Sequence, residues 1–243
     1  MSNASSFFSV ENTSMKRTMA LYGQAQLEFK NMLYLTLTGR NETSSTLPEA
    51  NNTFFFPSAS LSFVFTDALG LSPSGILPYG KLRVSYAQVG KDAPAQALKT
   101  YYGSTLVFDG FTTGLIYPLN GVSGFSLGTV TSVIGNPDLK PERTNSFEIG
   151  TDLSFVKNRI SFSGTYYNER TVDQIFTVAI PYTTGFASVI LNAGEIKNEG
   201  VELSLNTTPV KTQNGLNWDL GFIWSKNENK VVSLAPGIDN LFL

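Results

Sequence analysis

The sequence predicts an all-β protein that forms part of an antiparallel transmembrane β-barrel. Three observations support this prediction. Eight segments alternate apolar and polar residues, each segment is about ten residues long, and the connections between segments alternate between short and long. Successive side chains of a strand point to opposite faces, so each predicted strand has one apolar face and one polar face.

The alternation is clearest in the second predicted strand, where Leu33, Leu35 and Leu37 alternate with Tyr34 and Thr36. In a soluble sandwich, the apolar faces of two sheets pack against each other in a core. In an outer-membrane barrel, the apolar faces contact lipid. The eight predicted strands are 21–29, 32–40, 57–66, 80–89, 144–155, 159–170, 197–206 and 216–226.

Strand length favours the membrane alternative. A tilted strand needs about 9–11 residues to cross a bilayer, whereas the mean strand of a soluble protein has about 5–6. The predicted strands match the first length, so we expect about eight strands of a larger barrel.

The connections indicate two different rims. Short turns are typical of one rim of an outer-membrane barrel and long loops of the other. A structureless loop of more than about 12–15 residues is uncommon in a compact domain and indicates a functional loop. The predicted short connections are 30–31, 67–79, 156–158 and 207–215, and the long ones are 41–56, 90–143 and 171–196.

Composition excludes several classes of function. The 243 residues carry a net charge of −2, which gives no electrostatic case for binding nucleic acid, since that requires a basic face. It has no run of about 18 apolar residues that would form a transmembrane helix. It contains no cysteine and no histidine, the commonest sources of structural metal sites, disulfides and general bases. We therefore expect no enzyme, no metal and no cofactor.

Most carboxylates that lie within the predicted strands fall on the polar faces. We interpret them as the wall of a water-filled lumen, paired with Arg40, Arg83 and Arg159. A glycosidase would instead need two carboxylates that converge on one bond, and no pair in the sequence indicates this. The carboxylates are Glu28, Glu148, Asp152, Glu202 and Asp219.

Aromatic residues form two groups. Those near strand ends are candidates for the girdles that flank the lipid-facing band of a barrel: Phe54, Phe55, Phe56, Tyr79, Tyr86, Tyr166, Tyr167, Trp218 and Trp224. Those in the long loops are candidates for substrate binding, and packing of the loops against one another is the favoured alternative: Tyr101, Tyr102, Phe108, Phe111, Tyr117, Tyr182 and Phe186.

Four stretches carry a family resemblance. Residues 136–144, Asn-Pro-Asp-Leu-Lys-Pro-Glu-Arg-Thr, resemble the segment that opens a barrel strand in SusC/RagA-type TonB-dependent transporters. Residues 192–202, Asn-Ala-Gly-Glu-Ile-Lys-Asn-Glu-Gly-Val-Glu, are similar to a second segment of that family, and residues 38–48 and 81–92 look like it as well. One departure is Asn41-Glu42-Thr43, where relatives usually have an Asp-Trp-like pair.

This resemblance implies a Gram-negative outer-membrane barrel of about 22 strands with an internal plug, of the kind found in Bacteroidota. It further implies TonB-dependent import of oligosaccharides or peptides, with TonB and a SusD-like lipoprotein as partners. The long loops would then meet the substrate and the lipoprotein. Loop specificity does not follow from fold, so the cargo stays open.

The N-terminus has no basic and apolar run of a signal peptide. This absence predicts either an internal fragment of a longer protein or a cloning remnant at residues 1–4. We expect residues 1–243 to be a partial barrel domain whose plug and remaining strands lie outside this chain. The alternative function is a soluble β-sandwich that binds carbohydrate or acts as an adhesin.

Overall fold

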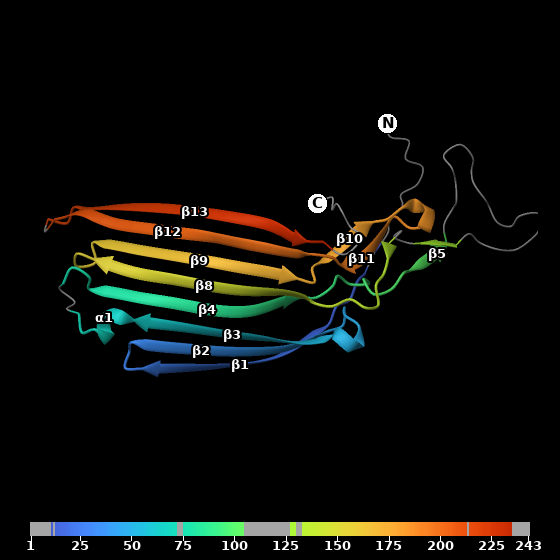
Figure 1. Cartoon of the computed structure of the whole chain (residues 1–243), viewed down its shortest axis with the longest axis horizontal. Coiled ribbons are helices and arrows are strands. Elements are labelled where there is room, and N and C mark those ends of the chain that lie inside the picture. The colour runs from blue at the N-terminus through green and yellow to red at the C-terminus, as the bar shows by residue number, and fades with distance from the viewer. Residues whose placement is uncertain are drawn as a thin grey trace, which may run out of the picture.

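A computed structural model of the chain describes residues 11, 13–71, 75–104, 127–129, 133–212 and 214–234. Its main feature is an eight-stranded antiparallel sheet in which each strand pairs with the next strand of the sheet along the chain (Figure 1). All eight predicted strands are confirmed. They are β1 (Thr18–Phe29), β2 (Leu33–Ser44), β3 (Thr53–Val64), β4 (Tyr79–Lys91), β8 (Glu142–Phe155), β9 (Ile160–Val172), β12 (Glu195–Lys211) and β13 (Asn217–Ser233).

Smaller elements lie in the connections. A three-stranded sheet has the order β10-β11-β7, and a two-stranded sheet pairs β5 with β6. The described residues include no helix long and apolar enough to cross a membrane. The bounds are β5 (Tyr102–Ser104), β6 (Leu127–Thr129), β7 (Val133–Ile134), β10 (Ile175–Ala179), β11 (Ser188–Asn192), α1 (Phe65–Ala68) and the 3-10 turns η1 (Glu49–Asn51) and η2 (Tyr182–Thr184).

The register places the apolar residues on one face of the large sheet. Residues directly opposite each other in neighbouring strands share a face, and one such row crosses seven strands: Leu27, Leu35, Leu61, Val84, Ile149, Tyr166 and Val201. The next residues along each strand lie on the opposite, polar face. The predicted alternation is therefore confirmed.

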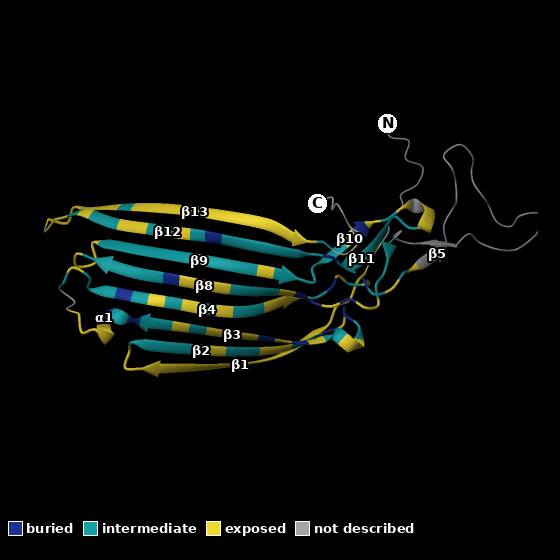
Figure 2. Cartoon of the chain, in the orientation of Figure 1, coloured by how far each residue is buried: buried dark blue, intermediate teal, exposed yellow. Residues whose placement is uncertain are grey.

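The apolar face is not covered. Leu21 is 78% exposed, Leu27 60% and Phe222 59%, and no second sheet packs on this face within the described ranges. Figure 2 shows the strands mostly exposed or intermediate, with few buried positions along their length. The sandwich alternative is therefore wrong, because it requires the apolar faces of two sheets to bury each other.

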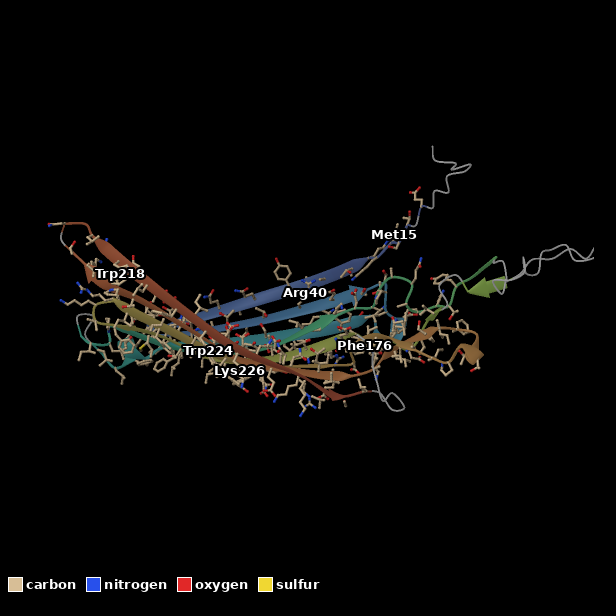
Figure 3. All side chains as sticks on the ribbon, turned by 90° about the horizontal axis from the view of Figure 1, so that it is seen from above. Met15, Arg40, Phe176, Trp218, Trp224 and Lys226 are labelled. Carbon is tan, nitrogen blue, oxygen red and sulfur yellow. The ribbon has the colours of Figure 1, made fainter. Side chains whose placement is uncertain are left out.

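The two rims differ as the sequence predicts. The turns at the end of the sheet opposite the labelled N and C termini join β1 to β2, β3 to β4, β8 to β9 and β12 to β13 (Figure 1). The first is tight, with Lys30 and Asn31 at φ 51° and 56°. The long connections leave the other end, which we call the loop rim. Figure 3 shows the same sheet turned by 90°, with β1 and β13 crossing in projection as a strongly twisted sheet requires.

One predicted loop is shorter than expected. The pairing of β2 with β3 continues as far as Thr43 and Thr53, so 41–56 shrinks to the connection 45–52. The atypical Asn41-Glu42-Thr43 stretch therefore lies inside a strand. The extra ladder hydrogen bonds favour strand over loop at these positions.

The aromatic girdle prediction is partly wrong. Phe54 and Phe56 are 5% and 8% exposed, respectively, in a core at the loop rim, and their ring centroids lie 5.0 Å apart. They point away from the apolar face because they alternate with Phe55, which is 58% exposed. By the same alternation, Tyr79 and Tyr167 lie on the polar face. The aromatics that do lie on the apolar face are Phe55, Tyr86, Tyr166, Trp218 and Trp224.

Candidate functional site

The loop rim is built around a small hydrophobic core. Its buried members come from the β2–β3 connection, the start of β3, the segment after β4 and the segment before β8, and three residues pack against it in part. Loops that bury apolar side chains hold a defined shape. The buried members are Leu47, Phe54, Phe56, Ala93, Ala97 and Leu139, and the partly buried ones are Leu98, Ile175 and Ile190.

Two of the family-like segments contact each other at this rim. The side-chain amide of Asn192 donates hydrogen bonds to the backbone carbonyls of Lys140 (2.9 Å) and Asp173 (2.7 Å), and its Oδ1 accepts one from the Lys140 N–H (2.9 Å). Three bonds to one amide hold two distant loops together. We call this contact, made by Asn192, Lys140 and Asp173, the motif clamp.

Glu142 and Leu139 extend the motif clamp. Oε1 of the buried Glu142 accepts a hydrogen bond from the Ile175 N–H at 2.9 Å, at the first residue of β10. Leu139 is fully buried in the rim core, and its carbonyl accepts a hydrogen bond from Asn51 Nδ2 at 3.3 Å. The segment that resembles a barrel-strand opening therefore ties the loops of three connections to the start of β8.

A third link crosses the first four strands. Asp92, which follows β4, accepts hydrogen bonds from Lys16, which precedes β1, and from Ser44 at the end of β2. Burial works toward a higher pKa for Asp92, but the hydrogen bonds from Lys16 and Ser44 outweigh it and hold the pKa below its ordinary value. We call the Lys16–Asp92–Ser44 contact the rim latch.

The polar face carries the carboxylates predicted for a lumen wall. Alternation places all five on this face, as expected. Of these five carboxylates, only Asp152 has an ion pair within the described part of the chain. It contacts Lys81 Nζ at 3.1 Å and accepts a hydrogen bond from Arg83 Nη2 at 3.3 Å. The predicted partner Arg40 instead contacts Glu42 at 2.6 Å.

The polar face is hollowed near its turn end. A hollow of about 540 Å³ is lined by hydroxyl, amide and charged side chains, among them Tyr34, Ser60, Asp67, Tyr79 and Lys81. These groups present both donors and acceptors. Within the described ranges, no cluster of three or more metal-binding side chains occurs.

The predicted loop aromatics lie in two of the long connections. Tyr101 is 41% exposed beside β5, and Tyr102 belongs to β5 itself. Tyr182 belongs to η2, and Phe186 is half-buried between η2 and β11. Phe108, Phe111 and Tyr117 lie outside the described residues. The residues that organise the rim were missed, although Leu139, Glu142 and Asn192 lie within the family-like segments and could have been found there.

Comparison with known proteins shows the family of this chain. Residues 2–240 match the family described as "TonB dependent receptor-like, beta-barrel". The chain belongs to the TonB-dependent receptor β-barrel family. The all-β barrel prediction and the resemblance to SusC/RagA-type receptors are confirmed, and the family places this receptor chain in the outer membrane.

Relatives share both sequence and fold with this receptor chain. TonB-dependent receptor P26 of Formosa agariphila is 33% identical over 90% of the chain, and SusC of Bacteroides thetaiotaomicron is 26% identical over 91%. The RagAB peptide importer in its closed-closed state matches 93% of the chain with a TM-score of 0.78 at 23% identity, which shows a shared fold. The chain spans 21% of each of the first two relatives and 23% of the matched RagAB chain.

Proposed function

We propose that this receptor chain is an arc of a SusC-like, TonB-dependent importer that moves oligosaccharides or peptides across the outer membrane. The family match over residues 2–240 carries the proposal. The relatives are receptors and importers by name, so we propose transport and no catalysis.

The proposal assigns the missing parts to the rest of the receptor. Because the chain spans about a fifth of its relatives, residues 1–243 are a partial barrel domain, and the plug and remaining strands lie elsewhere in the polypeptide. TonB supplies energy from the periplasmic side, and a SusD-like lipoprotein covers the loop rim. The lipid partner is the outer membrane, which contacts the apolar face.

Cargo recognition in this proposal belongs to the loop rim and to the polar face below it. The rim core and motif clamp hold the long connections in place, which reduces the ordering cost of binding. The exposed ring of Tyr101 and the half-buried ring of Phe186 would contact the cargo by stacking or through apolar surface. The other candidates are Tyr102, Phe108, Phe111, Tyr117 and Tyr182.

An uptake experiment tests the proposal. Cells with and without the complete receptor are given two probes, a tryptic digest of casein and a mixture of plant oligosaccharides, and depletion of each component is followed by mass spectrometry. We expect receptor-dependent depletion of components from one probe, and loss of that depletion when a protonophore removes the energy that TonB transmits. Equal depletion without the receptor, or uptake that the protonophore leaves unchanged, would contradict the proposal.

A further inference from the structure

Three cations lie side by side on the apolar face of the sheet. The register places Arg170 of β9 opposite Lys197 of β12, and Lys197 opposite Lys230 of β13. Like charges directly opposite each other destabilise a sheet. We call Arg170, Lys197 and Lys230 the cationic row. Repulsion among these three cations therefore destabilises the sheet unless anions lie close to them.

The position of the row on the strands is as informative as its charge. Toward the turn end, the same face continues through Val201 and Leu203 in β12 and through Trp224 in β13. Figure 3 shows Trp218, Trp224 and Lys226 following one another along β13. The cationic row therefore lies beyond the end of the apolar band, on the side of the loop rim, and Asn168, Glu199 and Glu228 lie between the two.

Strand geometry gives the height of the row above the hydrocarbon. Four residues separate Lys197 from Val201, which is about 13 Å along a strand and about 10 Å of membrane depth at the usual tilt of barrel strands. The headgroup layer is about 5–8 Å thick on each side of the hydrocarbon. The row consequently lies above the acyl chains, at the outer side of the headgroup layer of the outer leaflet, while Lys226, opposite Val201, lies at the border of the hydrocarbon.

Three carboxylates neutralise part of this surface, which with Lys226 holds four cations. Glu228 of β13 lies on the same face between Lys226 and Lys230, opposite Glu199. Arg170 Nε contacts Glu195 Oε1 at 2.6 Å, and Lys197 Nζ contacts Glu199 Oε2 at 2.9 Å. Both cations remain accessible, with 58% and 37% of their side chains exposed. Exposed ion pairs of this kind are weak and exchange partners readily.

Two lysines of β13 complete the surface. Lys226 and Lys230 are exposed and have no ion pair within the part of the chain that the structure describes. Lys226 lies between Trp224 and the row, at the upper border of the apolar band. An amine at that level donates hydrogen bonds to phosphate oxygens while its stem stays against lipid.

We propose that the cationic row and Lys226 bind phosphate groups of lipid headgroups in the outer leaflet. The charge complementarity of the row and its level in the membrane both favour phosphorylated lipid over a protein partner. Each cation near an anionic lipid surface contributes about 1 kcal/mol, so loss of Lys226 and Lys230 lowers the retention of such a lipid about thirtyfold. The site is separate from the cargo-binding rim and independent of cargo identity.

Lipid retention in nanodiscs tests the proposal. The complete receptor is placed in phosphatidylcholine nanodiscs that contain bisphosphorylated lipid A as the probe, and bound lipid is measured by native mass spectrometry. The test variant is the double substitution Lys226→Gln and Lys230→Gln. The matched control is Lys30→Gln and Lys157→Gln, which makes the same charge change at exposed lysines of the turn rim.

We expect the wild type and the control to retain lipid A. The test variant should retain about thirtyfold less lipid A, with unchanged β content and heat-modifiable migration. Lipid A stripped of both phosphates should not be retained by the wild type. Equal retention by all three proteins, or retention of the dephosphorylated probe, would overturn the proposal. A change of oligomeric state without a change in lipid would also overturn it, since the surface would then be a protein contact. Loss of cargo uptake with intact lipid A retention would count against the proposed transport function alone.

Discussion

Leu35 and Thr36 are neighbours in β2 that point to opposite faces. Leu35 lies opposite Leu27 and Leu61, whereas Thr36 lies opposite Gln26 and Ser60. Both positions are half-buried. The same substitution at the two positions therefore compares the two faces at one depth in the membrane.

We predict that Leu35→Arg lowers the free energy of unfolding of the complete receptor by about 2–4 kcal/mol, the cost of a cation on the lipid face near the bilayer midplane. Thr36→Arg should cost much less because its charge stays in water. Denaturant titration in lipid vesicles measures both values. Equal costs at the two positions would contradict the assignment of the faces.

Asn192 carries the motif clamp through two donors and one acceptor. Asn192→Asp removes both donors and turns a carboxylate toward the Lys140 and Asp173 carbonyls. Carbonyls left without a partner cost about 1–3 kcal/mol, and we predict that this cost loosens the rim locally and leaves the sheet folded.

Hydrogen exchange of the complete receptor measures this effect. Backbone amides of 138–142 and 173–176 should exchange faster in Asn192→Asp. The control Asn206→Asp changes an exposed amide that, among the described residues, bonds through its side chain to Ser204 alone, and it should leave those segments unchanged. Unaltered exchange in the test variant would show that the motif clamp does not hold the loops.

The end of β4 illustrates how a strand terminates in the rim core. Beyond Ser58, β3 no longer pairs with β4, and the Phe56 ring fills the space against Gly90. A Cβ on Gly90 would lie 2.2 Å from that ring and 2.8 Å from the Glu142 carbonyl oxygen. Among the described residues, a Cβ on Gly23 in β1 would have no atom within 4 Å beyond its own residue and its two chain neighbours.

Gly90→Ala should therefore destabilise the complete receptor by about 1–3 kcal/mol through overpacking, while Gly23→Ala should have little effect. Denaturant midpoints in lipid vesicles compare the two variants. If both alanines were equally tolerated, the packing of Phe56 against β4 would not be as described.

The rim latch gives the connection after β4 a dependence on pH. The folded pKa of Asp92 lies below its ordinary value of about 3.9. The stabilisation is therefore fully present above that ordinary value, and it is lost as the pH falls through the lower folded pKa. We predict no change between pH 5 and 8 and a release of the latch only at strongly acidic pH.

Proteolysis of the complete receptor with pepsin at pH 2 to 4 measures this release as cleavage after β4. Asp92→Asn should make cleavage independent of pH in this range, relative to a reference cleavage elsewhere in the receptor. Asp138→Asn, at an exposed position, should behave as wild type. A wild-type pH profile in Asp92→Asn would assign the release to another group.

The strands could be predicted from the sequence because their signal is local. Apolar and polar residues alternate within each segment, and this alternation predicts all eight strands of the large sheet. The extension of β12 to Lys211 and of β13 to Ser233 could not be predicted in this way. The end of β13 places the charged residues Lys226, Glu228 and Lys230 on the otherwise apolar face, and the end of β12 contains Pro209, so the partner strand is needed to keep both ends extended.

The rim could not be predicted because its contacts join distant segments. The parallel pairing of β7 with β11 links residues more than fifty positions apart, and no local pattern encodes it. Phe54 and Phe56 have the composition of a girdle but lie in the rim core, since alternation with Phe55 turns them away from lipid. The aromatic candidates in the loops were chosen by composition, and their role in cargo binding stays a prediction.

At the level of the whole molecule, the chain leaves three surfaces unsatisfied. The apolar face is open, and β1 and β13 are edge strands of 12 and 17 residues. Long exposed edges pair with other chains, and an apolar face of this extent associates in water. The large sheet therefore needs lipid on one face and further strands at both edges.

We predict that the isolated 243-residue chain aggregates in buffer and gains β content as a dispersed species only when refolded into detergent micelles. The reason is that a micelle covers the apolar face, whereas water cannot. Size-exclusion chromatography with light scattering and circular dichroism follow the refolding, and the same detergent below its critical micelle concentration is the control. A monodisperse, β-rich monomer in plain buffer would mean that the apolar residues bury one another, which contradicts both the open sheet and its place against lipid. In the micelle-bound chain, β1 and β13 each have a partner strand on one side, whereas β8 and β9 have partners on both sides. The backbone amides of β1 and β13 should therefore exchange hydrogen faster than those of β8 and β9.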